Sequence, residues 1–149
     1  TPELGVAEAV LALGPRRGRL PVSLVHGGLH RDHVVRQGAR LALLDFEKVS
    51  VGPRVEGLAR SAYHVGFRAN DETADPRRMV AYARAYHRVL TLAACEVEAL
   101  TGLVLRCFVR DMHVHRAQPE ERARIALVLG EFLANRANLA GAFLRYLGT

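Results

Sequence analysis

The sequence has little lysine, little cysteine and no tryptophan. Its two cysteines, Cys95 and Cys107, are far apart and lack the CxxC spacing of a metal or redox site, so we expect two buried thiols. Charged residues interrupt every long hydrophobic stretch, which excludes a membrane-spanning helix, and the basic-then-apolar start of a signal peptide is missing. These absences predict a cytoplasmic protein without a membrane partner.

The positive charge comes almost entirely from arginine, because Lys48 is the only lysine behind a formal net charge of +6. The arginines are scattered along the chain, and no aromatic residues are interleaved with them, which argues against a nucleic-acid site. An arginine-rich domain that binds anions or nucleic acid stays as an alternative. With 149 residues, half of them hydrophobic, the chain is long enough for one domain, residues 1–149, with a substantial core.

Short apolar runs come first along the chain and helical periodicity follows. Residues 20–25 and 41–46 are short and bounded by turns, which favours buried strands, and Val34 and Val35 could pair with residues 41–44 across Gln37-Gly38. Residues 3–13 are typical of the end of a helix. Further helices are predicted over 54–67, from Asp75-Pro76 through Tyr86, over about 93–115, and from Pro119 towards Leu147. The fold class is therefore α+β, with a short β-hairpin layer followed by a mainly helical bundle.

The segment 24–60 carries the informative motif and reads LVHGGLHRDHVVRQGARLALLDFEKVSVGPRVEGLAR. It resembles the catalytic core of the aminoglycoside phosphotransferase and choline kinase family, in which an HGDxHxxN loop precedes an apolar strand, a DFD-like or DFE-like turn and a GDPxxDLA-like helix start. With the helices that follow, the resemblance extends over about 20–147. It implies the C-terminal lobe of a protein kinase-like fold that phosphorylates a hydroxyl of a small molecule, such as an aminoglycoside, with ATP and Mg²⁺.

The resemblance assigns a role to each residue of the loop and the turn. Asp45 matches the aspartate that holds Mg²⁺, His33 stands at the position of the metal-ligating Asn, and Glu47 could assist in cofactor binding. Imidazole suits Mg²⁺ less well than an oxygen does. His26 is expected to pack against the metal-binding turn as a structural residue.

Two aspartates of the family pattern are replaced by glycine. Gly28 stands where the catalytic Asp is expected, so the chain lacks the carboxylate that orients the acceptor hydroxyl, and Gly57 replaces the Asp that anchors the catalytic loop. Asp32 is a substitute base in an alternative His-Arg-Asp frame. That frame leaves only thirteen residues from Asp32 to Asp45, whereas Gly28 lies seventeen residues before Asp45, as in the family.

Other interpretations of the same residues remain. His26, His30 and His33 could bind zinc, although the glycines between them favour a loop and no cysteine lies nearby. The chain could also be a non-catalytic, pseudokinase-type binding or scaffold module, or a fragment of a working enzyme. A glycine-rich phosphate loop and an ATP-binding lysine are missing, so we expect the N-terminal ATP-binding lobe to be absent from this chain. The strand layer over about 41–51 would then be left bare, as a surface for a second copy or a partner chain.

Overall fold

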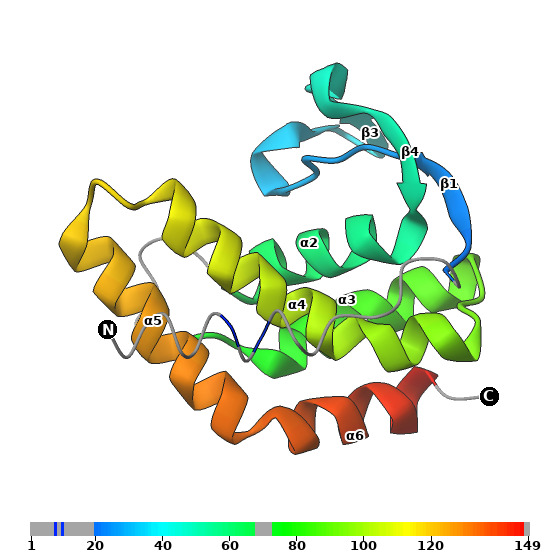
Figure 1. Cartoon of the computed structure of the whole chain (residues 1–149). Coiled ribbons are helices and arrows are strands. Elements are labelled where there is room, and N and C mark those ends of the chain that lie inside the picture. Colours follow the sequence, from blue (N-terminus) through cyan, green and yellow to red (C-terminus); the bar gives the residue numbers. More distant parts are fainter. Residues whose placement is uncertain (1–7, 9, 11–19, 68–72, 148–149) are drawn as a thin grey trace.

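The computed structural model describes residues 8, 10, 20–67 and 73–147. A layer of short strands and loops arches over α2, and the helices form a bundle beneath it (Figure 1). This arrangement confirms the predicted α+β fold class of a kinase-like C-terminal lobe. The helix predicted over residues 3–13 lies outside the described residues except for Glu8 and Val10, both of which are helical.

The strands form two separate antiparallel pairs. In the first, β1 (Val22–Val25) pairs with β4 (Ser50–Pro53), so that Val22 lies opposite Pro53. In the second, β2 (Val34–Gln37) pairs with β3 (Arg40–Leu43), which confirms the predicted pairing across the Gln37-Gly38 turn. The strand β4 was not predicted, because its sequence contains Gly52 and Pro53 and shows no run of apolar residues.

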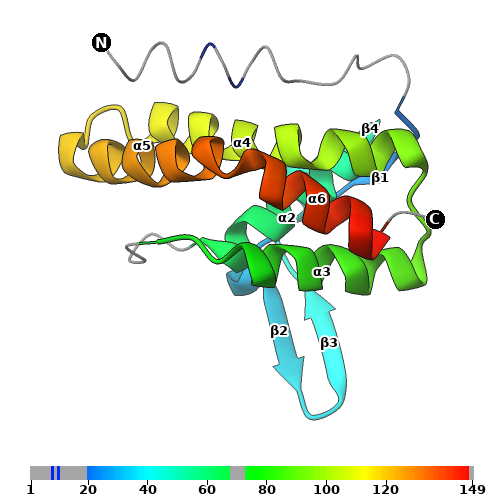
Figure 2. The same cartoon turned by 90° about the horizontal axis from the view of Figure 1, so that it is seen from below.

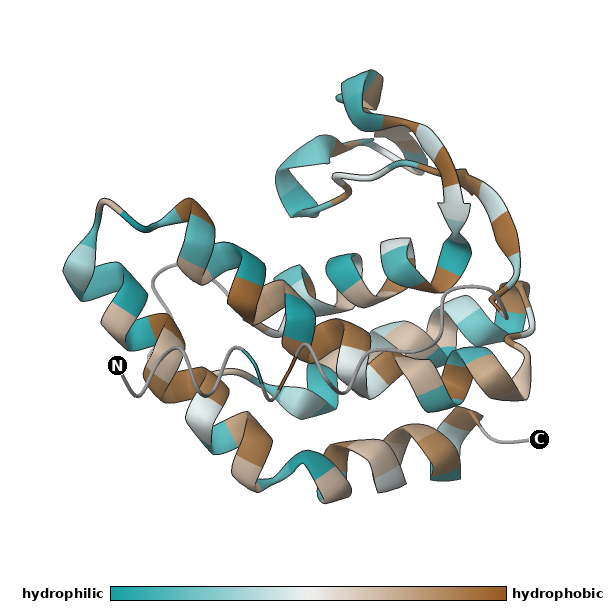
Figure 3. Cartoon of the chain, viewed as in Figure 1, coloured by the Kyte–Doolittle hydropathy of each residue, from teal (hydrophilic) through white to brown (hydrophobic). Residues whose placement is uncertain are grey.

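The prediction that the strands are buried is wrong. Every residue of β2 and β3 is exposed, and β1 alternates between exposed and partly buried positions. The reason is that a two-stranded sheet is too small to bury its own side chains, and β2 and β3 contact mainly each other. Figure 3 shows hydrophobic residues along β1 and β4, in the strand layer above α2.

Five helices follow the strands in the described part of the chain: α2 (Arg54–Gly66), α3 (Pro76–Val89), α4 (Ala94–Val114), α5 (Pro119–Ala134) and α6 (Arg136–Leu147). The predicted start of α3 is confirmed, because the Asp75 side chain accepts hydrogen bonds from the backbone N–H groups of Arg77 and Arg78, and Pro76 follows it. None of these helices is long and apolar enough to cross a membrane.

The single helix predicted from Pro119 to Leu147 is wrong, because the chain turns at Asn135. This residue ends α5 with φ −102° and ψ 12°, and its amide nitrogen Nδ2 donates to the Glu131 carbonyl. Asparagine favours such local hydrogen bonds over a continued helix. The turn brings α6 back against α3 and α4 (Figure 2).

The hydrophobic core lies where α4 meets α2, α5 and α6. Its largest buried side chains include Tyr63 and Phe108, whose ring centroids are 4.7 Å apart in an edge-to-face arrangement. The core thus fixes α2, and α2 in turn supports the loop that carries the candidate site.

Candidate active site

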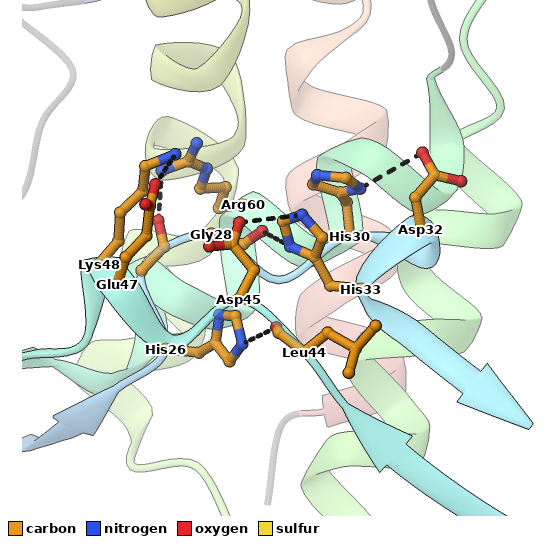
Figure 4. A network of polar contacts seen from close by, with 11 residues as sticks. His26, Gly28, His30, Asp32, His33, Leu44, Asp45, Glu47, Lys48 and Arg60 are labelled. Atoms are coloured by element: carbon orange, nitrogen blue, oxygen red, sulfur yellow. Dashed lines mark hydrogen bonds and ion pairs between the residues drawn. The ribbon is translucent and has the colours of Figure 1, made fainter.

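The loop between β1 and β2 and the turn after β3 meet at one point above α2 (Figure 4). The His33 ring joins them: its Nε2 lies 3.1 Å from Oδ2 of Asp45, and its Nδ1 lies 2.9 Å from the Gly28 carbonyl oxygen. The structure therefore brings together the three positions that the motif predicted to converge. Both side chains are partly buried, with 18% of the His33 and 31% of the Asp45 side-chain surface exposed.

Asp45 has a left-handed backbone, with φ 64° and ψ 62°, and is the only such non-glycine residue among the described ones. This conformation costs energy for a residue with a side chain, although aspartate tolerates it better than most. Strain of this kind persists where the surroundings enforce it, and it gathers at functional sites. Here it makes the chain turn sharply from β3 into the short 3-10 helix Phe46–Lys48.

The two adjacent glycines of the loop differ in whether a larger residue could replace them. Gly27 has φ 75°, and a Cβ there would collide with the Lys48 carbonyl oxygen, so the position demands glycine. Gly28 lies outside the left-handed region, and a Cβ there would lie 3.5 Å from the Lys48 Cδ, an ordinary contact. A side chain, including that of aspartate, could therefore start at position 28 without moving the backbone.

His26 connects the loop to the turn that follows β3. Its Nε2 lies 2.9 Å from the Leu44 carbonyl oxygen, and its ring centroid lies 4.8 Å from that of Phe46. The His26 ring therefore holds the loop beside Asp45, which is a positioning contact.

The loop is anchored from below by α2 side chains that the sequence reasoning missed. The Arg60 guanidinium donates a hydrogen bond to the Gly27 carbonyl, and the Ser61 hydroxyl lies 3.2 Å from the Leu29 carbonyl oxygen. Arg60 and Ser61 follow Gly57 by three and four residues, so all three lie on one face of α2. This helical spacing is the signal that could have identified them. The space beside Gly57 is filled, since a Cβ there would lie 2.6 Å from Cγ1 of Val25.

A fourth histidine, His64, lies behind the loop and was not predicted. Its ring centroid is 5.5 Å from that of His30, and burial lowers the pKa of His64 to about 4 despite the nearby Asp111 carboxylate. Asp111 accepts a 2.5 Å hydrogen bond from the Tyr63 hydroxyl. Because His64 is neutral at pH 7, it adds no positive charge behind the loop.

Asp32 and Glu47 lie at the edge of the site with exposed carboxylates. Asp32 is 3.3 Å from Arg31 and 3.5 Å from His30, and Figure 4 shows it on the far side of the His30 ring from Asp45. Glu47 lies 3.5 Å from the ammonium of Lys48. The structure thus brings neither residue into the His33–Asp45 pair.

Of the two residues of the pair, Asp45 fits Mg²⁺ and His33 fits it poorly. This ion prefers oxygen ligands, usually one or two carboxylates with waters and phosphates, whereas His33 offers an imidazole. Within the described residues, no group of three or more His, Cys, Asp or Glu side chains could hold a metal ion, which leaves the zinc interpretation of the three histidines without support. Asp45 remains the residue whose chemistry suits a cation.

Comparison with known proteins places this site in a family context. The model of the phosphotransferase enzyme family matches residues 2–92, which is more than half of the chain and includes the loop, the turn and α2. No curated protein matches the chain.

Proposed function

Since the chain belongs to the phosphotransferase enzyme family, we propose that it forms the C-terminal lobe of a small-molecule phosphotransferase whose transfer step is impaired at position 28. One observation carries the proposal: the loop and the turn are joined through His33 and Asp45, as a working site requires, while position 28 offers no carboxylate. The acceptor that fits this class is a hydroxyl group of a small molecule, such as an aminoglycoside. ATP as the donor suits a cytoplasmic location.

Phosphoryl transfer in kinase-like sites depends mainly on positioning and on charge stabilisation. A carboxylate at position 28 would accept a hydrogen bond from the acceptor hydroxyl and orient it; glycine offers no side chain to do so. Asp45 retains its carboxylate, and the contacts of His26, Arg60 and Ser61 hold the loop in place. The family in general uses ATP and Mg²⁺, and Mg²⁺ supplies charge neutralisation at the phosphates. Asp45 would be the residue of the pair that holds the ion, because it supplies the carboxylate.

A non-catalytic, pseudokinase-type binding module is the second candidate. The observation that favours it is that the Lys48 Cδ lies 3.5 Å from where a Cβ at position 28 would stand. This methylene group accepts no hydrogen bond, so it cannot replace the missing carboxylate. In this alternative the lobe binds its ligand without transferring phosphate.

Restoring the carboxylate tests the proposal. The full-length protein and its Gly28→Asp variant are incubated with radiolabelled ATP, Mg²⁺ and a panel of aminoglycosides and other hydroxylated small molecules. We expect wild type to show no measurable transfer and Gly28→Asp to gain transfer to at least one acceptor by about a hundredfold or more over background, because a positioned acid or base contributes on that scale. Gly28→Asn, which has the same shape without the charge, is the matched control.

Two outcomes contradict the proposal. Robust transfer by wild type that Asp32→Asn abolishes would make Asp32 the base. A folded Gly28→Asp variant that binds ATP but transfers no phosphate to any acceptor would favour the non-catalytic module.

A further inference from the structure

A cavity lies between α3, α6 and the end of α5, on helices that do not carry the loop and the turn of the phosphotransferase site. Its volume is about 690 Å³, within the range of roughly 300–1,000 Å³ that is typical of small-molecule sites. Figure 2 shows α3 and α6 side by side and running in the same direction. The start of α3 therefore lies beside the α5–α6 corner, and its later turns lie beside the end of α6.

The cavity has an apolar floor. Val80, Phe132 and Leu139, one from each of the three helices, line it and are almost completely buried. Two small residues, Ala81 on α3 and Ala142 on α6, line it as well. Because alanine leaves space that a larger side chain would fill, these positions keep the groove open.

Charged and aromatic groups surround this floor. Arg84 from α3 lies over the ring of Tyr146 from α6, with its guanidinium carbon 5.7 Å from the ring centroid. Arg77 also lines the cavity, and Glu131 is the one carboxylate among the lining residues. Glu131 is near the end of α5 and Arg77 is in the first turn of α3, so both lie near the α5–α6 corner. Arg84 lies towards the opposite end of the cavity. The Arg84 end is therefore positive and has an aromatic wall.

We propose that this groove is a binding site for a small aromatic anion, with its ring on Phe132, Leu139 and Tyr146 and its anionic group on Arg84. An arginine guanidinium pairs well with carboxylate, sulfonate or phosphate, and it keeps its charge at any physiological pH. The apolar floor supplies affinity through burial of the ring, and the arginine selects the anion.

Fluorescence titration with 1-anilinonaphthalene-8-sulfonate tests the site, because this probe combines a fused aromatic ring with a sulfonate. Its neutral analogue N-phenyl-1-naphthylamine has the same rings without the charge. We expect Arg84→Gln to weaken binding of the anionic probe about tenfold or more, the loss of roughly 1.4 kcal/mol or more, and to leave the neutral probe within about twofold. Arg88→Gln, an exposed arginine on the same helix outside the cavity, is the matched control.

Filling the groove should remove binding of both probes. Ala142→Trp places an indole in the cavity from α6, and Ala81→Leu places an isobutyl group in it from α3. Circular dichroism shows whether each variant folds, and if one does not, the other still tests the site. Leu41→Ser tests whether the probe binds the exposed strands instead, because Leu41 is 68% exposed on β3. Anionic-probe binding that survives both filling variants, or that is lost in Leu41→Ser, would overturn the proposal, as would equal binding by wild type and Arg84→Gln.

Discussion

At the residue scale, the two neighbouring glycines of the loop differ in whether the backbone requires a glycine. Gly27 is required by its backbone, since it has a positive φ and lies against the Lys48 carbonyl oxygen. Gly28 is not required by any contact of the backbone. The absence of a carboxylate at position 28 is therefore a chemical property of this chain and has no steric cause in the fold.

A pair of alanine substitutions tests this distinction. Gly27→Ala should lower the free energy of unfolding by at least about 2 kcal/mol, because it adds the left-handed backbone penalty to a collision with backbone. Gly28→Ala should change it by no more than about 0.5 kcal/mol. Urea unfolding followed by circular dichroism measures both, and equal effects of the two substitutions would contradict the assignment.

The contacts of the His33–Asp45 pair could be predicted from the motif only in part. The motif predicted that these residues would meet, and they do. It could not predict that the His33 ring would bridge Asp45 and the Gly28 carbonyl, or that Asp45 would be left-handed, because both depend on the exact path of two loops. Their roles in catalysis stay predictions.

At the scale of elements, one buried ion pair fixes the start of α2 against the start of α4. Nε and Nη2 of Arg54 donate to the two carboxylate oxygens of Glu96 at 2.7 and 2.6 Å, and Nη2 also donates to the Thr91 carbonyl at 2.8 Å. The Glu96 carboxylate in turn accepts the Ala93 backbone N–H at 2.8 Å and is fully buried. The pair thereby sets the position of α2, and with it the support of the candidate site.

Removing the charge of Glu96 should destabilise the fold. Glu96→Gln leaves the Arg54 guanidinium with no carboxylate partner in the pair, which typically costs about 3 kcal/mol. Glu98→Gln, an exposed glutamate on the same helix, is the control and should change the free energy of unfolding little. A Glu96→Gln variant as stable as Glu98→Gln in urea would contradict this role.

The same pair predicts a dependence of stability on pH. Burial raises the pKa of Glu96, but the hydrogen bonds from Arg54 and from the Ala93 N–H outweigh it, so the pKa is lowered overall. A carboxyl whose pKa is lower in the folded state contributes stability above its ordinary pKa and loses it as the pH falls through the lowered value. The difference in unfolding free energy between wild type and Glu96→Gln should therefore shrink in acid.

The order of the elements was well predicted from the sequence, whereas their packing was not. Helical periodicity and the Asp75-Pro76 cap located α2, α3 and α4, since both signals are local. The break at Asn135 and the strand β4 escaped prediction, because the first depends on one side-chain hydrogen bond and the second on pairing with β1, twenty-five or more residues earlier in the chain. The anchoring of the loop by Arg60 and Ser61 likewise appears only once α2 lies beneath it.

At the scale of the whole molecule, most of the exposed large hydrophobic side chains lie in the strand layer. The helices enclose a well-packed core, while the strand layer presents large hydrophobic side chains to solvent. Leu24 and Val51 are 73% and 76% exposed and are direct partners in the β1–β4 pair, so they lie side by side. Both two-stranded sheets also have strand edges that no other described strand covers.

We propose that a second copy of the chain covers this face in solution. Contiguous exposed apolar side chains usually mark an interaction surface, and the open strand edges offer backbone hydrogen bonds to a matching strand. Light scattering at micromolar concentration should therefore report a dimer or a larger species. Replacing Leu24 and Val51 together with lysine should shift it to the monomer, because like charges would then meet across the interface.

Leu127 provides the matched control, because it is 66% exposed but lies on α5, in the helical part of the molecule. Leu127→Lys should leave the oligomeric state unchanged if the strand layer is the interface. A wild-type chain that is strictly monomeric at these concentrations would contradict self-association, and would leave the strand face to a partner of another kind. An oligomer that persists in the double lysine variant but is lost in Leu127→Lys would move the interface from the strands to the helices.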